Sequence, residues 1–101
     1  MRVEPAPLLI LEVIGSGAGS SRIFELRGPM MARESYRPAT MKIDIWQKDM
    51  SIIGAFARAL GIATPTFSAT AAVYDEAQRQ GFGADDVAAI HAVLARRSSR
   101  Q

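Results

Sequence analysis

The sequence predicts an all-α protein, a bundle of about five helices without a sheet. Apolar residues between Met41 and Leu60 recur at intervals of four and three, which is the period of an amphipathic helix. Helix-stop and helix-start residues then follow at suitable intervals, namely Gly61, Pro65, Gly81 and Asp85. The chain has 101 residues, 49% of them hydrophobic, which is enough for one domain with its own core. We therefore expect a single helical domain over residues 1–101.

The first helix is expected over residues 6–14. This apolar stretch suits either a buried strand or a short helix, and Pro7 and Glu12 favour the helix. The glycine- and serine-rich run 15–21 then breaks the chain.

A second helix is expected over about 22–33. Ser20 or Ser21 can cap its start, and Pro29 should bend or interrupt it. Residues 32–40 are polar and predict a loop.

The strongest helix is expected from Met41 to Leu60. Its apolar stripe contains Trp46, Met50, Ile53, Ala57 and Leu60. Three further residues widen that stripe and predict burial on more than one side, namely Ile45, Ile52 and Phe56. Gly61 is a suitable stop in the left-handed conformation.

Two more helices complete the expected bundle. Thr64 should cap the first, which starts at Pro65 and runs to Gln80 with one apolar face made of Phe67, Ala71, Tyr74 and Ala77. Asp85 or Asp86 should cap the last helix, which ends near Arg97. Its inward residues are expected to be Val87, Ile90, His91 and Leu94.

Composition excludes several function classes. The chain has no cysteine and one histidine, so thiolate and His-rich metal sites are ruled out and no metal site is expected. The net charge is only +2 and the arginines are spread out, so no nucleic-acid partner is expected. No apolar run approaches the roughly 20 residues of a membrane helix, so no membrane partner is expected either. A cytoplasmic location fits this composition.

A glycine motif in the first third suggests nucleotide binding but is incomplete. An apolar run precedes Gly15-x-Gly17-x-Gly19, and Asp44 could act as the acidic residue of such a fold. Ser20 occupies the position that the third glycine requires, and no third strand is predicted. We interpret these glycines as helix-breaking residues between two helices.

A family resemblance covers about residues 8–96. It is carried by Gly19 to Met31, by Lys48-Asp49-Met50-Ser51-Ile52-Ile53, by the stretch from Ala57 to Pro65, and by Gln80 to Asp86. In this order they resemble the C-terminal helical domain of the β-hydroxyacid dehydrogenase family, which has a fold like the C-terminal domain of 6-phosphogluconate dehydrogenase. These motifs are most similar to those of the threonate dehydrogenase-like branch.

The resemblance implies a cofactor and substrate site on the 41–60 helix. Lys48 and Asp49 match the first two positions of a family segment that borders NAD or NADP. Lys48 would approach the nicotinamide end, Asp49 would border the substrate pocket, and Met41 would stand where some relatives have an aromatic wall residue. Ile53 and Ala55 depart from the family pattern, which weakens the expected contact with the cofactor. From the residues alone, Lys48 and Asp49 would point to solvent or pair with neighbours.

The resemblance also implies missing parts. The family's dinucleotide-binding domain has no counterpart in this sequence. The family's catalytic lysine is followed four residues later by an asparagine, and this motif has no counterpart either, because the chain contains no asparagine. No catalytic residue is therefore assigned, and His91 is expected to be structural. We expect a detached C-terminal domain that closes the cofactor site, is inactive alone and binds no cofactor by itself, with a possible separate N-terminal dehydrogenase domain as partner.

A non-catalytic helical association module is the alternative function. Without covering domains, apolar residues should remain exposed and drive formation of a homodimer or larger assembly. These are Leu8, Leu9, Ile10, Ile52, Ile53 and Phe56.

Overall fold

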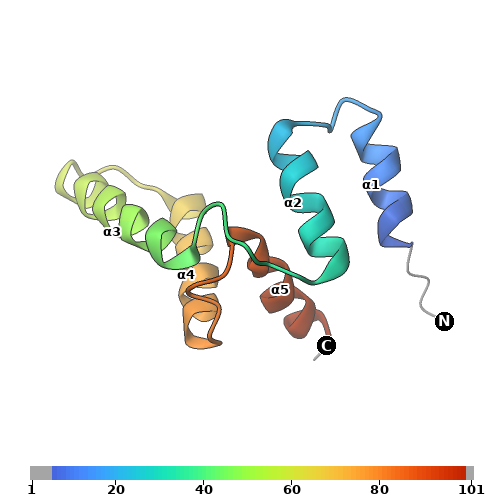
Figure 1. Ribbon diagram of the computed structural model, residues 1–101. Helices are drawn as coiled ribbons and strands as arrows, with labels where there is room; N and C mark the ends of the chain where they lie inside the picture. Colours follow the sequence, from blue (N-terminus) through green and yellow to red (C-terminus); the bar gives the residue numbers. More distant parts are fainter. Residues whose placement is uncertain (1–5, 100–101) are drawn as a thin grey trace. The chain divides into compact units, whose positions relative to one another are not determined.

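The computed structural model describes residues 6–99 as helices joined by loops and turns (Figure 1). The elements are α1 (Pro7–Gly15), α2 (Arg22–Arg33), α3 (Ile43–Ala59), α4 (Pro65–Arg79), the 3₁₀ turn η1 (Val87–Ala89) and α5 (Ile90–Ser99). Within these residues the only β-type pairing is one isolated antiparallel bridge, between Lys42 and Asp86. The all-α prediction with five α-helices is confirmed. One compact unit ends at Ser35 and a second begins at Tyr36.

The first unit is a pair of helices in close contact. A Cβ atom on Gly28 of α2 would lie 2.6 Å from Leu11 Cδ2 of α1, so glycine permits this approach. Ser21 caps α2 as predicted, because its hydroxyl accepts a hydrogen bond from the Phe24 N–H at 3.0 Å. The segment expected over 6–14 is helical from Pro7 to Gly15, which settles its strand-or-helix ambiguity.

Pro29 does not interrupt α2, so that part of the prediction was wrong. The helix runs unbroken from Arg22 to Arg33 with Pro29 inside it. A proline removes the hydrogen bond that its own nitrogen would donate, and its ring crowds the carbonyl four residues earlier. Gly28 and Met30 on either side are buried, and this packing holds the helix together.

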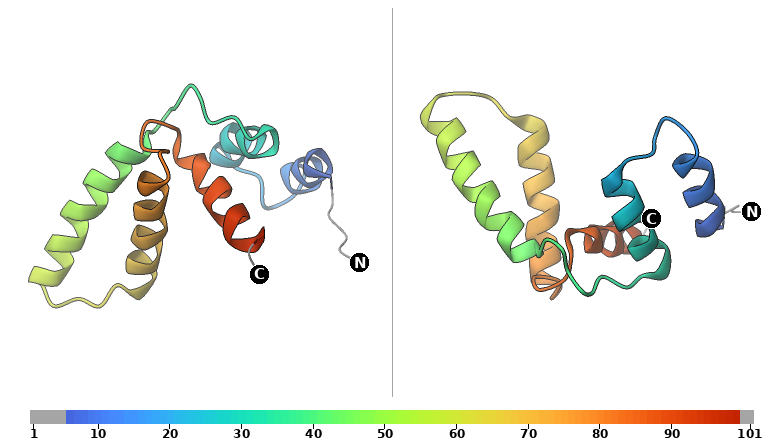
Figure 2. Two further views of the ribbon diagram at one scale, coloured as in Figure 1. Left: turned by 90° about the horizontal axis from the view of Figure 1, so that it is seen from below. Right: turned by 45° about the horizontal axis from the view of Figure 1, so that its top comes forward.

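The second unit is built on a hairpin of α3 and α4, which lie side by side (Figure 2). Gly61 ends α3 with φ +69° and donates to the Arg58 carbonyl at 3.1 Å, while the Ile62 N–H reaches the Ala57 carbonyl at 3.0 Å. These paired bonds are the Schellman motif that favours glycine. The predicted helix stop is confirmed.

The core of this unit lies where α4, η1 and α5 meet the start of α3. Ile43, Ala77, Ala89 and Val93 are fully buried. Leu94, expected to point inward, is 46% exposed instead. The 3₁₀ turn explains this error, because its three residues per turn shift the phase of α5 and place Val93 inside.

Two other expectations about the hairpin were wrong. Thr64 occupies the cap position of α4 but makes no capping side-chain hydrogen bond with any described residue. The apolar residues that widen the stripe of α3, Ile45, Ile52 and Phe56, are exposed rather than buried. One helix, α4, covers one side of α3, and within the described residues of this unit the opposite side is left open.

Candidate functional site

The three residues that the sequence assigned to a site all belong to α3 or lie just before it. Lys48 and Asp49 are exposed, and Met41 is half-buried. Among the described residues Lys48 and Asp49 have no ion-pair partner. Ile45 and Ile52 lie within one helical turn of both and are 50% and 59% exposed. The outward face of α3 therefore presents the Lys48 cation and the Asp49 carboxylate next to two exposed isoleucines.

Asp86 holds the segment that leads into α3. Its side chain is completely buried, and Oδ1 accepts from the Thr40 N–H at 3.0 Å, the Thr40 hydroxyl at 2.9 Å and the Met41 N–H at 3.2 Å. Oδ2 accepts from the Ala88 N–H at 2.9 Å. This one carboxylate ties the 40–41 segment to the turn before α5 and fixes the position of Met41.

Backbone hydrogen bonds reinforce the same junction. The Ile43 N–H donates to the Asp85 carbonyl at 3.0 Å, and the Asp44 N–H donates to the Gly83 carbonyl at 2.9 Å. The Val87 N–H in turn donates to the Met41 carbonyl at 2.9 Å. The first turn of α3 is therefore held by the 83–87 segment, one to two turns before Lys48.

The charge state of Asp86 follows from these contacts. Burial by itself raises the pKa of Asp86, but the hydrogen bonds from Ala88, Met41 and Thr40 outweigh it and hold the pKa below its usual range. Asp86 is therefore a carboxylate at neutral pH. The sequence predicted Asp85 or Asp86 only as a cap, because no local pattern reveals bonds to residues 45 and 46 positions away.

A groove of about 470 Å³ lies between α3 and α4. Met50, Gly54, Phe67 and Ala71 are among its lining residues, with Arg58 as its cation. A Cβ on Gly54 would lie 3.3 Å from the Phe67 ring, so the two helices pack closely there. Neither Lys48 nor Asp49 lines this groove, which is separate from the outward face of α3.

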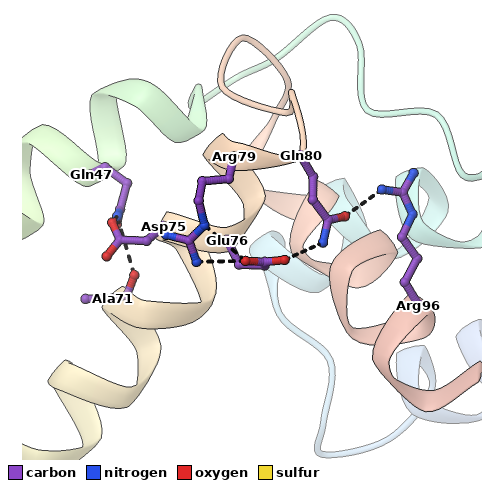
Figure 3. Close-up of polar contacts among 7 residues, drawn as sticks. All are labelled: Gln47, Ala71, Asp75, Glu76, Arg79, Gln80 and Arg96. Atoms are coloured by element: carbon purple, nitrogen blue, oxygen red, sulfur yellow. Dashed lines mark hydrogen bonds and ion pairs between the residues drawn. The ribbon is translucent and has the colours of Figure 1, made fainter. Parts of the chain in front are cut away.

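Side-chain hydrogen bonds join the helices of the second unit, as Figure 3 shows. The Gln47 amide on α3 donates to the Asp75 carboxylate and to the Ala71 carbonyl on α4.

The Gln80 amide donates to Glu76 Oε1 at 2.9 Å, and its own oxygen accepts from Arg96 on α5 at 2.5 Å. Together with Arg79, which contacts Glu76 Oε2 at 2.7 Å, Gln80 lowers the pKa of Glu76. These bonds keep α3, α4 and α5 in one arrangement.

His91, expected to be structural, makes a side-chain contact within the second unit. Its Nδ1 lies 3.3 Å from the Tyr36 hydroxyl, and both residues are at least half-buried. The Tyr36 ring meets the Phe82 ring edge-on at 6.4 Å between centroids. The Tyr36–His91 contact joins the loop before α3 to the start of α5.

Neither a metal centre nor a membrane span is found in the part of the chain that the structure describes. No group of three or more potential ligand side chains gathers among residues 6–99. No helix in that range is both long and apolar enough to cross a bilayer. The Gly15–Gly19 run joins two helices, so the strand that a dinucleotide motif needs is not there.

Comparison with known proteins agrees with the resemblance seen in the sequence. A family model described as NAD-binding of NADP-dependent 3-hydroxyisobutyrate dehydrogenase matches residues 3–94. The chain is 28% identical over 95 residues to glyoxylate/succinic semialdehyde reductase 2, chloroplastic, from Arabidopsis thaliana, covering 94% of this chain and 26% of that protein. It is 28% identical over 82 residues to L-threonate dehydrogenase from Haemophilus influenzae, covering 81% and 27%.

A solved structure has the same fold. The 3-hydroxyisobutyrate dehydrogenase of Salmonella typhimurium superimposes with a TM-score of 0.76 at 25% identity. The match covers 87% of this chain and 30% of the enzyme. The chain therefore spans between a quarter and a third of the length of the proteins it matches.

Proposed function

Because the chain belongs to the family described as NAD-binding of NADP-dependent 3-hydroxyisobutyrate dehydrogenase, we propose that it is the helical domain that closes the cofactor and substrate site of an NAD(P)-dependent hydroxyacid dehydrogenase. The observation that carries the proposal is the outward face of α3. There Lys48 and Asp49 are exposed and without ion-pair partners among the described residues, and the helix that carries them starts at a rigid junction. A surface that closes over a ligand needs such groups held in fixed positions.

In this proposal each of the three residues has a distinct part. Lys48 approaches the nicotinamide end of NAD or NADP, Asp49 borders the substrate pocket, and Met41 forms part of its wall. The nicotinamide accepts or donates the hydride when bound. The exposed Ile45 and Ile52 beside Lys48 suit a site from which closure excludes water.

The described residues fit only one end of such a cofactor. A pyrophosphate is normally held by a glycine-rich turn between a strand and a helix. In residues 6–99 the glycine run lies between two helices instead. We therefore propose that this chain alone is inactive and binds NAD(P) weakly at most.

The names of the similar proteins suggest the substrate class. They act, by name, on glyoxylate or succinic semialdehyde, on L-threonate and on 3-hydroxyisobutyrate. All are small carboxylates that also carry a hydroxyl or carbonyl group. We propose a substrate of this kind for the complete enzyme, and a cytoplasmic location.

A non-catalytic association module is the second candidate, and the exposed apolar side chains of α3 favour it. Weak cofactor binding separates the two, because a site-closing domain should contact NAD(P) through α3 and an association module should not, whereas neither should turn over a substrate alone. The purified chain is mixed with NAD or NADP and a panel of small 2- and 3-hydroxyacids, and reduced nicotinamide is followed by absorbance. Calorimetry with each cofactor completes the test. We expect no turnover and an affinity weaker than micromolar, whereas micromolar binding by the chain alone would overturn the proposal.

A further inference from the structure

Lys48 has an acid in helical register beside it, yet the two side chains do not pair. Asp44 precedes Lys48 by four residues on α3, and an acid four positions before a lysine is the order in which such pairs form best. Asp49 is the adjacent residue, and neighbours in sequence do not face each other on a helix. Among the described residues Lys48 nevertheless has no ion-pair partner. Another contact must therefore hold the Asp44 carboxylate.

A glutamine of α4 makes that contact. The Gln78 amide donates to Asp44 Oδ1 at 2.9 Å. The carboxylate also lies against Gly83, where a Cβ atom would collide with both of its oxygens. A hydrogen bond to a charged acceptor is usually stronger than an exposed ion pair between successive turns of one helix. The amide therefore keeps Asp44 turned toward α4 and the 83–87 segment instead of toward Lys48.

The other acids of this region already have partners. The two acids of α4 are bound by amide and guanidinium groups, as Figure 3 shows, and the two acids of the 83–87 segment are bound as well. These acids are Asp75, Glu76, Asp85 and Asp86. The orientation of Asp44 therefore decides whether Lys48 is paired or free.

We propose that Gln78 is a positioning residue for the cofactor contact. It holds Asp44, so that the Lys48 ammonium stays unpaired and free to meet the nicotinamide end of NAD or NADP. This inference rests on the function proposed above for Lys48. The apparent affinity for a ligand falls in proportion to the fraction of chains whose contact group is available. Loss of the Gln78 amide should therefore return Asp44 to Lys48 and weaken the cofactor contact.

Carbodiimide cross-linking tests the pairing of Lys48 without any cofactor. The reagent joins a lysine amine to a carboxylate that lies in contact with it, and the chain has only two lysines. Tandem mass spectrometry locates the resulting amide. Gln78→Ala should raise the yield of the amide between Lys48 and Asp44 about twofold, the change in population that corresponds to one ion pair across a helical turn.

Gln80→Ala is the matched control for this experiment. Gln80 is also a glutamine with a donated side-chain bond, but its amide holds Glu76 and not Asp44. This variant should leave the yield of the Lys48–Asp44 amide at the level of the unmodified chain. An unchanged yield in Gln78→Ala, or an equal rise in both variants, would overturn the proposal.

Amide chemical shifts during titration with NAD or NADP test the consequence for binding. Gln78→Ala should weaken the response at Lys48 about twofold. Addition of Asp44→Ala should restore it, because the competing carboxylate is then gone, whereas damage to the fold would not be repaired by a second truncation. A response that stays weak in the double variant would contradict the proposal. If the unmodified chain shows no response at Lys48, the proposed function fails, and the cross-linking yields still decide whether Gln78 keeps Lys48 unpaired.

Discussion

Asp86 binds Thr40 twice, through the backbone N–H at 3.0 Å and through the hydroxyl at 2.9 Å, although 46 positions separate the two residues. The same carboxylate accepts from the Met41 and Ala88 N–H groups. This one buried side chain makes all three of these long-range bonds to residues 40–41, just before α3, alongside the backbone bonds of the 83–87 segment. Because α3 carries Lys48 and Asp49, the junction contributes to stability and also positions the helix that bears the proposed site residues.

Removal of the Asp86 carboxylate should cost much of the stability of the second unit. Asp86→Ala leaves buried donors unsatisfied and should lower the free energy of unfolding by about 3 kcal/mol. Urea denaturation followed by circular dichroism measures this. Asp85→Ala is the control, since Asp85 pairs with the exposed Arg37 at 2.5 Å and should contribute within about 1 kcal/mol. Equal losses in the two variants would show that Asp86 is not the anchor.

The depressed pKa of Asp86 predicts a loss of stability in acid. Its folded pKa lies below the ordinary value of 3.8, so the unfolded chain takes up the proton first as the pH falls. The stabilisation is complete above about pH 5 and is lost as the pH falls through 3.8 and then through the folded pKa. Urea midpoints of the unmodified protein and of Asp86→Asn should converge over that range. A constant difference between them down to the lowest pH would contradict the assignment.

Glu34 should be replaceable by glycine with a gain in stability. It ends α2 in the left-handed region, with φ +53°, while the Ser35 N–H donates to the Met30 carbonyl at 3.1 Å. Glycine adopts this conformation without a Cβ penalty, so Glu34→Gly should stabilise the chain by about 0.5–1 kcal/mol. Gly61→Ala, at φ +69° in open space, should lose a similar amount. Thermal or urea unfolding compares the two, and changes in the same direction would refute the prediction.

Gly83 and Asp44 should show strong energetic coupling. A Cβ at position 83 would collide with the Asp44 carboxylate, which also accepts from the Gln78 amide at 2.9 Å. Gly83→Ala should therefore cost roughly 1–2 kcal/mol, because Asp44 must move and give up that bond. In an Asp44→Ala background the same change should cost much less. A double-mutant cycle measures the coupling, and strictly additive effects would contradict the close contact.

The helices followed from local signals, whereas the contacts between them did not. Gly61 and Gly81 marked helix ends correctly, since a left-handed stop depends on the residue itself. The phase of α5 was misjudged because nothing local signals the 3₁₀ turn at Val87–Ala89. The four-bond role of Asp86 depends on partners in a distant loop, and periodicity carries no information about them. Lys48 and Asp49 were found through resemblance, because an exposed pair on a helix looks the same whether it binds a ligand or only water.

The most direct test of the central claim is a titration of the isotopically labelled chain with NAD and NADP, followed by amide chemical shifts. We predict weak, millimolar binding with shifts centred on Met41, Lys48 and Asp49. Lys48→Gln should abolish these shifts and Lys42→Gln should preserve them, a matched pair because these are the only two lysines in the chain and both are exposed. Shifts centred elsewhere, or equal binding by both variants, would contradict the claim that α3 carries the nicotinamide contact of this domain.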